Sequence, residues 1–212
     1  MKRTFLYILA ALLAASCKNS SVQNNKSEGD KPVITVTIEP LRYFTEAIAG
    51  NNFNVISMVP KGSSPETYDP TPQQLVDLAK SKAYFRIGFE QTWMDKLTDN
   101  APHLQFFDTS RGIELIADSS LAHHHHDADE PHAHDSIQDD EHQHLLGVEP
   151  HVWSSAYNAQ IIAGNIVNAL CAIDKGNEEV YMERYKSLCN QIEHTDSLIC
   201  HMLSAPNADR AF

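Results

Sequence analysis

The sequence predicts an α/β fold, with a parallel-sheet amino-terminal lobe followed by one long helix. Three observations lead to this fold class. Short β-branched or aromatic runs alternate with helical patterns between residues 33 and 107. The connections between them are short, which favours right-handed crossovers and parallel strands. After residue 177, one three-four pattern of apolar residues continues for roughly seven turns at ~3.6 residues each.

Strands and helices are expected to alternate through the lobe. Buried strands are predicted over residues 33–38, 53–59, 83–87 and 104–107. Helices are predicted over 41–49, 72–81 and 91–98. Thr71 can cap the second helix, and Pro72 suits its first position. Ligands of parallel sheets lie beyond the carboxyl ends of the strands, so the site is expected in the loops 39–40, 61–70, 88–90 and 108–112.

Two more helices are expected near the carboxyl end. Ser154 or Ser155 can cap a helix that runs to about Asp174, and Asn177 can cap a second one that runs to about Ser204. The apolar stripe of the second helix comprises Tyr181, Tyr185, Leu188, Ile192, Ile199 and Leu203. Part of this stripe would be exposed if nothing packs on it, which predicts poor solubility.

The amino terminus is predicted to be a lipoprotein signal peptide over residues 1–16. Lys2 and Arg3 precede a short apolar segment, and small residues lead to Cys17, the expected lipidation site. A plain cleaved secretory signal is the alternative. Residues 17–31 are polar and are expected to form a flexible tether. We therefore expect a protein of the periplasm or cell surface that is anchored to the membrane through its lipid.

Charge and cysteine content narrow the partners. The formal net charge of −12 and the lack of a basic patch exclude nucleic acid and favour cations. Besides Cys17, the chain has Cys171, Cys189 and Cys200 without a C-x-x-C motif, which argues against a cysteine zinc site. A disulfide between Cys171 and Cys189 stays open, but buried free thiols are favoured.

A histidine-rich segment, within an expected loop over residues 118–148, is the strongest indication of metal binding. Eight of the 12 histidines fall between residues 123 and 144, among seven Asp or Glu and no Lys or Arg. Neutral imidazole is a common ligand for zinc, copper and nickel. We expect this loop to gather metal, with a solvated loop of no metal role as the alternative. Its histidines are His123, His124, His125, His126, His132, His134, His142 and His144.

Two further segments carry a family resemblance. The turn after the second strand has the pattern G-x-S-x-x-x-Y-x-P-T-P over residues 62–72, and the segment after the loop reads Glu149-Pro150-His151-Val152-Trp153. In this order, together with Ile38-Glu39-Pro40-Leu41, they resemble the zinc and manganese substrate-binding lipoproteins of bacterial ABC importers, the ZnuA-like metal-binding family. The resemblance runs from about residue 33 to 212, and the His/Asp loop resembles the zinc branch.

The resemblance implies a two-lobed periplasmic protein that binds its metal in the cleft between lobes. Residues 32–175 would form the amino-terminal lobe, 177–204 the interlobe helix and 205–212 the start of a second lobe. The third and fourth ligands would then lie beyond Phe212. We therefore expect an incomplete chain, with a complete one-lobed protein as the alternative.

Two metal ligands are implied for the first lobe. His151 matches the family's P-H-x-W position, with a histidine merely packed beside Trp153 as the alternative. Glu66 stands where the family's turn usually has histidine. A glutamate oxygen can bind Zn²⁺, and it also suits Mn²⁺, which is the alternative metal. A solvated acid is the other interpretation of Glu66.

The expected function is capture of Zn²⁺ by a monomeric lipoprotein that delivers it to the membrane permease of an ABC importer. A metal-buffering or adhesion lipoprotein that acts through the loop alone is the alternative. The chain has no H-E-x-x-H and no G-x-S-x-G motif, so we expect no enzyme activity. Metal binding by the loop should fade below pH ~6.5, because only neutral imidazole binds metal.

Overall fold

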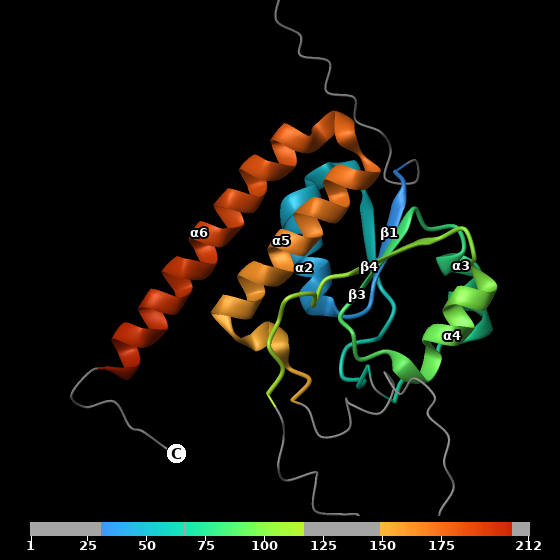
Figure 1. Ribbon diagram of the computed structural model, residues 1–212, viewed down its shortest axis with the longest axis horizontal. Helices are drawn as coiled ribbons and strands as arrows, with labels where there is room; N and C mark the ends of the chain where they lie inside the picture. The colour runs from blue at the N-terminus through green and yellow to red at the C-terminus, as the bar shows by residue number, and fades with distance from the viewer. Residues whose placement is uncertain (1–30, 66, 117–148, 205–212) are drawn as a thin grey trace, which may run out of the picture. The chain divides into compact units, whose positions relative to one another are not determined.

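The computed structural model describes residues 31–65, 67–116 and 149–204, and the described residues from Pro32 onward form one compact unit. Its centre is a sheet of four parallel strands in the order β2-β1-β3-β4 (Figure 1). The strands are β1 (Val33–Val36), β2 (Asn54–Ser57), β3 (Ala83–Arg86) and β4 (Gln105–Asp108). The predicted parallel α/β sheet is confirmed, with each strand inside or within one residue of its expected range.

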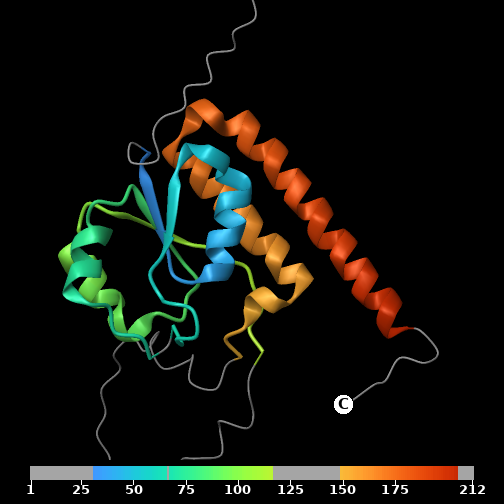
Figure 2. The same ribbon diagram turned by 180° about the vertical axis from the view of Figure 1, so that it is seen from behind.

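Helices cover both faces of the sheet. One face carries α2 (Glu39–Ala49) and α5 (Ala156–Ile173), and the other carries α3 (Pro72–Leu78) and α4 (Gln91–Asn100), as Figures 1 and 2 show. Strands covered on both faces need apolar residues in succession rather than in alternation. Accordingly, Ile34, Val36 and Phe85 are fully buried, and the buried residues of the sheet and the surrounding helices form one core.

Three helix boundaries differ from the prediction by two or more residues, and one of them is the end of α4, at Asn100 rather than residue 98. Helix α2 begins at Glu39 rather than residue 41, because Pro40 lies within its first turn, where proline lacks only a hydrogen that would be unpaired anyway. Helix α3 ends at Leu78 rather than residue 81. Its predicted cap is confirmed, since Thr71 forms a reciprocal capping box with Gln74.

Helix α5 begins after Ser155, whose hydroxyl accepts a hydrogen bond from the Asn158 N–H, so Ser155 rather than Ser154 is its cap. By length and composition α5 is the one described helix that could cross a membrane. That is weak evidence, because core helices pass the same test. Here α5 packs against α2 and α6 (Glu178–Leu203), and its inward residues are buried.

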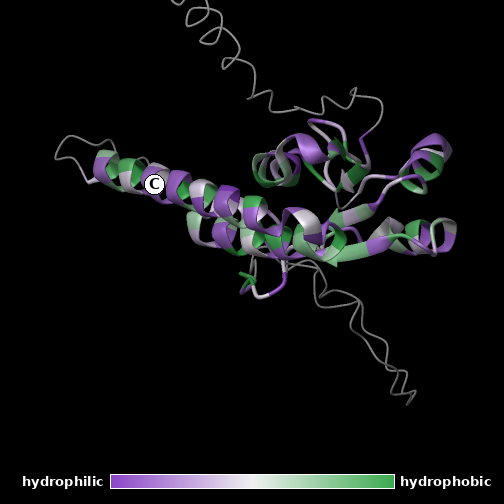
Figure 3. Cartoon of the chain, turned by 90° about the horizontal axis from the view of Figure 1, so that it is seen from above, coloured by the Kyte–Doolittle hydropathy of each residue, from purple (hydrophilic) through white to green (hydrophobic). Residues whose placement is uncertain are grey.

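Helix α6 is packed along its first half only. Tyr181 and Leu188 are buried and Tyr185 and Ile192 are partly buried, whereas Ile199 is 50% exposed. The predicted stripe is therefore covered at one end and exposed at the other, and Figure 3 shows hydrophobic residues recurring out to the free end of α6. The predicted capping bond of Asn177 is wrong. Asn177 occupies the cap position, but its side-chain amide donates to Asp174 Oδ2 at 2.9 Å. The two residues lie at the two ends of the short helix η5 (Lys175–Asn177).

Long-range hydrogen bonds join the start of α6 to the end of α2. The Arg184 guanidinium donates to the Ala49 carbonyl at 2.9 Å. Asn52, at the end of the short helix η2 (Gly50–Asn52), donates to the Tyr181 hydroxyl at 2.9 Å, and that hydroxyl donates to Asp174 Oδ2 at 2.5 Å. These bonds attach α6 to the lobe near residues 49–52.

The three cysteines that the structure describes are free thiols. Cys171 and Cys189 are partly buried, and burial raises the pKa of each. Cys200 is exposed, because nothing in the described ranges covers the end of α6.

Several predictions lie outside the described residues. These are the signal peptide, Cys17 and the tether, Glu66, the eight histidines of the loop, and residues 205–212. The division of the chain into a lobe and an interlobe helix stays a prediction.

Candidate metal site

A cavity of about 540 Å³ lies beyond the carboxyl ends of β1 and β2. It is lined by residues 38–40 after β1, residues 59–65 after β2, and Pro150, His151 and Trp153. The structure thus brings together two of the four predicted loops and the predicted ligand His151. The two loops meet because parallel strands end at the same edge of the sheet, and the segment of His151 joins them from the region before α5.

The turn that leads to Glu66 is anchored from both sides. The indole N–H of Trp93, a fully buried residue of α4, donates to the Pro65 carbonyl at 2.9 Å. On the other side, the Tyr68 hydroxyl donates to Gln74 Oε1 at 2.8 Å, and its ring contacts Trp93 edge-on. Glu66 itself lies outside the described residues, so its role as a ligand stays a prediction.

His151 lines the same cavity and lies just before the short helix η4 (Val152–Ser154). Its side chain is 66% exposed, and its ring packs edge-on against Trp153 with the ring centroids 5.2 Å apart. The contact with Trp153 was the alternative to a ligand role. Because the ring both touches Trp153 and faces the cavity, packing does not prevent metal binding.

Glu149 is a functional candidate to which the sequence had assigned no role. Its Oε1 atom lies 2.5 Å from His151 Nδ1 and 3.0 Å from the His151 backbone nitrogen. The spacing of two residues was the available signal, because it lets a carboxylate reach the backbone and ring of one histidine together.

Charged residues also line the mouth of the cavity after β1. Glu39 Oε1 lies 3.5 Å from Arg42 Nη1, and Oε2 lies 3.9 Å from Lys61 Nζ. Exposed ion pairs of this kind stabilise a fold only slightly. They do keep Glu39 beside cations, so this carboxylate is a weaker metal ligand than its position alone would indicate.

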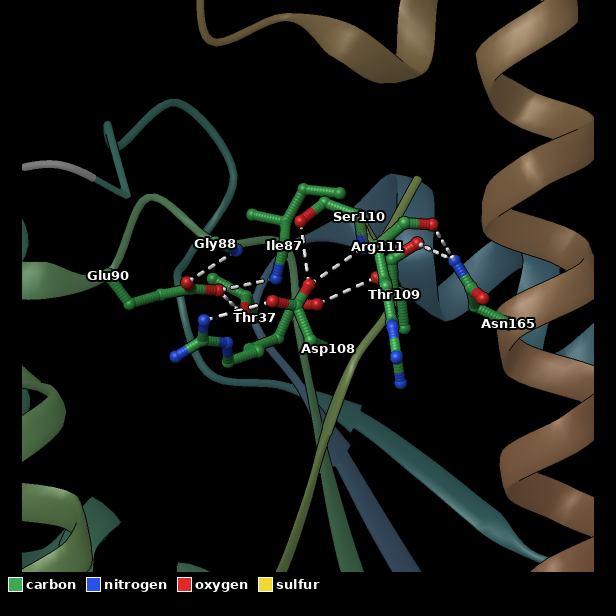
Figure 4. A network of polar contacts seen from close by, with 10 residues as sticks. Thr37, Ile87, Gly88, Glu90, Asp108, Thr109, Ser110, Arg111 and Asn165 are labelled. Atoms are coloured by element: carbon green, nitrogen blue, oxygen red, sulfur yellow. Dashed lines mark hydrogen bonds and ion pairs between the residues drawn. The ribbon is translucent and has the colours of Figure 1, made fainter. Parts of the chain in front are cut away.

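The loop over residues 88–90 is not among the residues that line the cavity. Its hydrogen bonds to residues that follow β1 and β3 are shown in Figure 4. The Glu90 side chain is almost fully buried. Its carboxylate accepts hydrogen bonds from the Ile87 N–H at 2.7 Å, the Gly88 N–H at 2.8 Å and the Thr37 hydroxyl. Burial raises the pKa of Glu90 although these bonds oppose the rise. The expectation that this loop contributes to the site is wrong, because the Glu90 carboxylate is buried and already hydrogen-bonded to Thr37, Ile87 and Gly88.

The loop over residues 108–112 is likewise tied to the protein. Asp108 accepts from the Ser110 hydroxyl at 2.6 Å and from the Arg86 guanidinium at 2.9 Å. Burial favours the neutral acid, but these bonds outweigh it and lower the pKa of Asp108. Asn165 of α5 donates to the carbonyls of Thr109 and Arg111, both at 2.9 Å (Figure 4). This loop therefore joins β4 to α5, and the expectation that it lines the site is wrong.

No three His, Cys, Asp or Glu residues within the described ranges lie close enough together to hold a metal. A zinc site normally needs four ligands, or three and a water. His151 would therefore need partners from outside these ranges to complete a tight site.

The two ends of the histidine-rich insertion meet beside the cavity. The Glu149 N–H donates to the Ile116 carbonyl at 2.9 Å. Residues 117–148 lie between these two residues and outside the described part of the chain. The chain therefore leaves the described fold at Ile116 and returns to it at Glu149, two residues before His151.

Comparison with known proteins gives a consistent result. A family model described as "ZnuA: Zinc-uptake complex component A periplasmic" matches residues 34–212. The Bacillus subtilis (strain 168) "High-affinity zinc uptake system protein ZnuA" is 28% identical over 199 residues, which cover 91% of this chain and 59% of that protein. The Streptococcus anginosus "Manganese ABC transporter substrate-binding lipoprotein PsaA" is 25% identical over 201 residues, 91% of this chain and 56% of that one.

The fold is also similar to that of a solved structure. A crystal structure of ZnuA superposes with a TM-score of 0.68 and 26% identity, over 84% of this chain and 61% of that chain. The present chain therefore spans less than two thirds of the length of each of these relatives.

Proposed function

This chain belongs to the ZnuA family of periplasmic zinc-uptake components, and from that membership we propose that it captures Zn²⁺ outside the cytoplasm for an ABC importer. The observation that carries the proposal is the cavity at the carboxyl ends of β1 and β2. It is lined both by His151 and by Pro65, the residue before Glu66. The imidazole of His151, together with the carboxylate that Glu66 is proposed to add, would suit a divalent cation.

In this proposal the protein binds and delivers the ion without catalysing a reaction. His151 would bind through its ring nitrogen and Glu66 through a carboxylate oxygen. A membrane permease of the ABC type would receive the ion from a monomer tethered by a lipid on Cys17, at the periplasmic or outer face of a membrane. The family membership supports this arrangement.

Zinc is the proposed cargo and manganese the second candidate. The Bacillus subtilis relative is named as a zinc-uptake protein, and the Streptococcus anginosus relative as a manganese transporter lipoprotein. His151 favours Zn²⁺, whereas the replacement of the family's usual histidine by Glu66 adds an oxygen ligand that Mn²⁺ also accepts. Competition between the two ions in a binding experiment would rank them.

The histidine-rich loop is proposed to gather metal near the cavity. The hydrogen bond between Glu149 and Ile116 supports this role, because it brings both ends of the insertion next to His151. The loop would raise the local concentration of metal, and the cavity would hold the transported ion.

Zinc titration of the full chain by calorimetry tests the proposal. His151→Ala should remove one tight site and leave weak binding by the loop. Deletion of residues 118–148 should remove the weak binding and leave the tight site. His194→Ala is the matched control, because His194 is an exposed histidine of α6 that lies outside the cavity lining. A tight site that survives His151→Ala would contradict the proposal.

A metal-buffering or adhesion lipoprotein is the second candidate, favoured by the eight histidines between residues 123 and 144. It predicts no effect of His151→Ala and loss of all uptake when the loop is deleted. Equilibrium dialysis at about pH 7.5 and about pH 5.5 tests the imidazole ligands that both proposals need, since the histidine pKa is ~6.5. Equal zinc uptake at both pH values would contradict both.

A further inference from the structure

A single carboxylate oxygen holds two nitrogen atoms of His151. Glu149 Oε1 lies 3.0 Å from the backbone N–H and 2.5 Å from ring Nδ1. An ionised carboxylate can only accept hydrogen bonds. The contact therefore requires that the hydrogen of a neutral His151 ring sits on Nδ1, which leaves the lone pair on Nε2.

The main chain around His151 is fixed as well. The His151 carbonyl accepts from the Ser154 hydroxyl at 2.7 Å and from the Ser154 N–H at 3.0 Å. Pro150 restricts the backbone before it, and Trp153 lies against the ring. Among the residues that the structure describes, none is bonded to Nε2, and the ring lines the cavity.

Glu149 is itself held in place. Its backbone N–H is bonded to the Ile116 carbonyl at 2.9 Å, so the residue that orients His151 is paired to the segment after β4. The Glu149 carboxylate thus connects the His151 ring to a residue whose own backbone is hydrogen-bonded to Ile116. Without this contact, the exposed imidazole would rotate freely and exchange between its two tautomers.

We propose that Glu149 is a positioning residue that holds neutral His151 in the Nδ1–H tautomer and presents Nε2 as the metal-binding atom. This inference rests on the proposed capture of zinc by the cavity. A second carboxylate behind a metal-binding histidine fixes ring orientation and raises the basicity of the ligand nitrogen. Zinc then meets an oriented donor without having to select one tautomer and one ring orientation.

The tautomer can be read directly in the metal-free full chain. Long-range ¹H–¹⁵N NMR spectra distinguish Nδ1–H from Nε2–H at a pH at which the ring is neutral, and the His151 signals are those absent from His151→Gln. We expect the Nδ1–H pattern in the wild type and a mixture of tautomers in Glu149→Ala. Glu149→Gln should restore much of the wild-type pattern, because its amide oxygen can still accept from Nδ1.

Zinc affinity is the second readout. Loss of such a partner typically weakens metal binding ~10–100-fold, and we expect this for Glu149→Ala. Glu183→Ala is the control, because it removes one exposed negative charge on α6, outside the cavity lining. If the alanine variant does not fold, Glu149→Leu keeps the side-chain bulk without an acceptor.

The Nδ1–H pattern unchanged in Glu149→Ala, or in Glu149→Leu, would overturn the inference. The NMR spectrum is recorded without metal, so it tests the tautomer inference alone. Failure of the wild type to bind zinc would instead count against the proposed function.

Discussion

Gly50, at the junction of α2 and α6, is expected to be one of the least replaceable residues of the described fold. Its φ of +59° and ψ of −128° belong to a region that residues with a Cβ rarely adopt. A Cβ built on Gly50 would lie 2.4 Å from Arg184 Nη1. That guanidinium donates to the Ala49 carbonyl at 2.9 Å. Gly50→Ala should therefore strain the backbone and also displace the hydrogen bond that attaches α6 to the end of α2.

The two effects can be given separate magnitudes. The backbone conformation should cost ~1–3 kcal/mol in an alanine. Loss of a hydrogen bond to a buried carbonyl should cost a further ~1–3 kcal/mol. The Arg184 side chain can swing aside, so no larger steric cost is expected. Gly50→Ala should thus lower the free energy of unfolding by ~2–6 kcal/mol, but by only ~1–3 kcal/mol in an Arg184→Ala background, where the hydrogen bond is already absent.

Urea unfolding followed by circular dichroism measures all four variants of this cycle. Gly62→Ala is the control for backbone strain alone, because Gly62 has a φ of +85° and no atom within 4 Å of a built Cβ. If Gly50→Ala has the same effect with and without Arg184, displacement of the guanidinium contributes nothing. If it has no effect in either background, the requirement for glycine is refuted.

Four further substitutions test the burial and hydrogen bonding described above. Leu188→Ala should cost ~2–5 kcal/mol of unfolding free energy, since Leu188 is buried. Ile199→Lys, at a half-exposed position of the same helix, should change the unfolding free energy by less than ~0.5 kcal/mol and raise solubility. Equal losses of unfolding free energy in the two variants, measured by chemical denaturation, would refute the packing described for α6. Trp93→Phe should cost ~1–3 kcal/mol or more, because the Pro65 carbonyl loses its buried donor, and a wild-type unfolding midpoint would contradict this. Burial raises the pKa of Glu90 above its ordinary 4.5, so the stability due to its protonation is complete below that pH and is lost as the pH rises through the raised pKa. Glu90→Gln should flatten this fall, and an unchanged pH dependence of denaturation from about pH 4 to about pH 8 would count against it.

The elements that could be predicted from sequence are those that local chemistry determines. The run from Val33 to Ile38 has too many β-branched residues for a favourable helix, and Thr71 with Pro72 marks a helix start by its own hydrogen bonding. The meeting of the loops after β1 and β2 followed from the rule that parallel strands end at one edge, which needs only the order of elements. The place of His151 beside these loops was expected only from the family resemblance.

Two kinds of feature were missed. Some depend on contacts between residues distant in the chain, and others depend on which of two nearby partners a side chain bonds to. Asn177 could cap α6 or bond to Asp174, and spacing alone does not rank the two. The loop that contains Glu90 was expected at the site, but the carboxylate is bonded to the nearby Ile87 and Gly88 N–H groups and to Thr37, which comes close only when β1 and β3 lie side by side. The pairing of Arg184 with Ala49 joins residues 135 positions apart, for which no local pattern exists.

The hydrogen bond between Glu149 and Ile116 makes the length of the insertion between them nearly independent of the rest of the fold. For a flexible loop closed at both ends, each doubling of length adds only ~0.6 kcal/mol to the entropy of closure. Shortening residues 117–148 eightfold, to a simple turn, would therefore stabilise the fold by only ~1.8 kcal/mol. Histidines can be added to or lost from this segment in evolution, or by design, while β4, α5 and the segment around His151 keep their places.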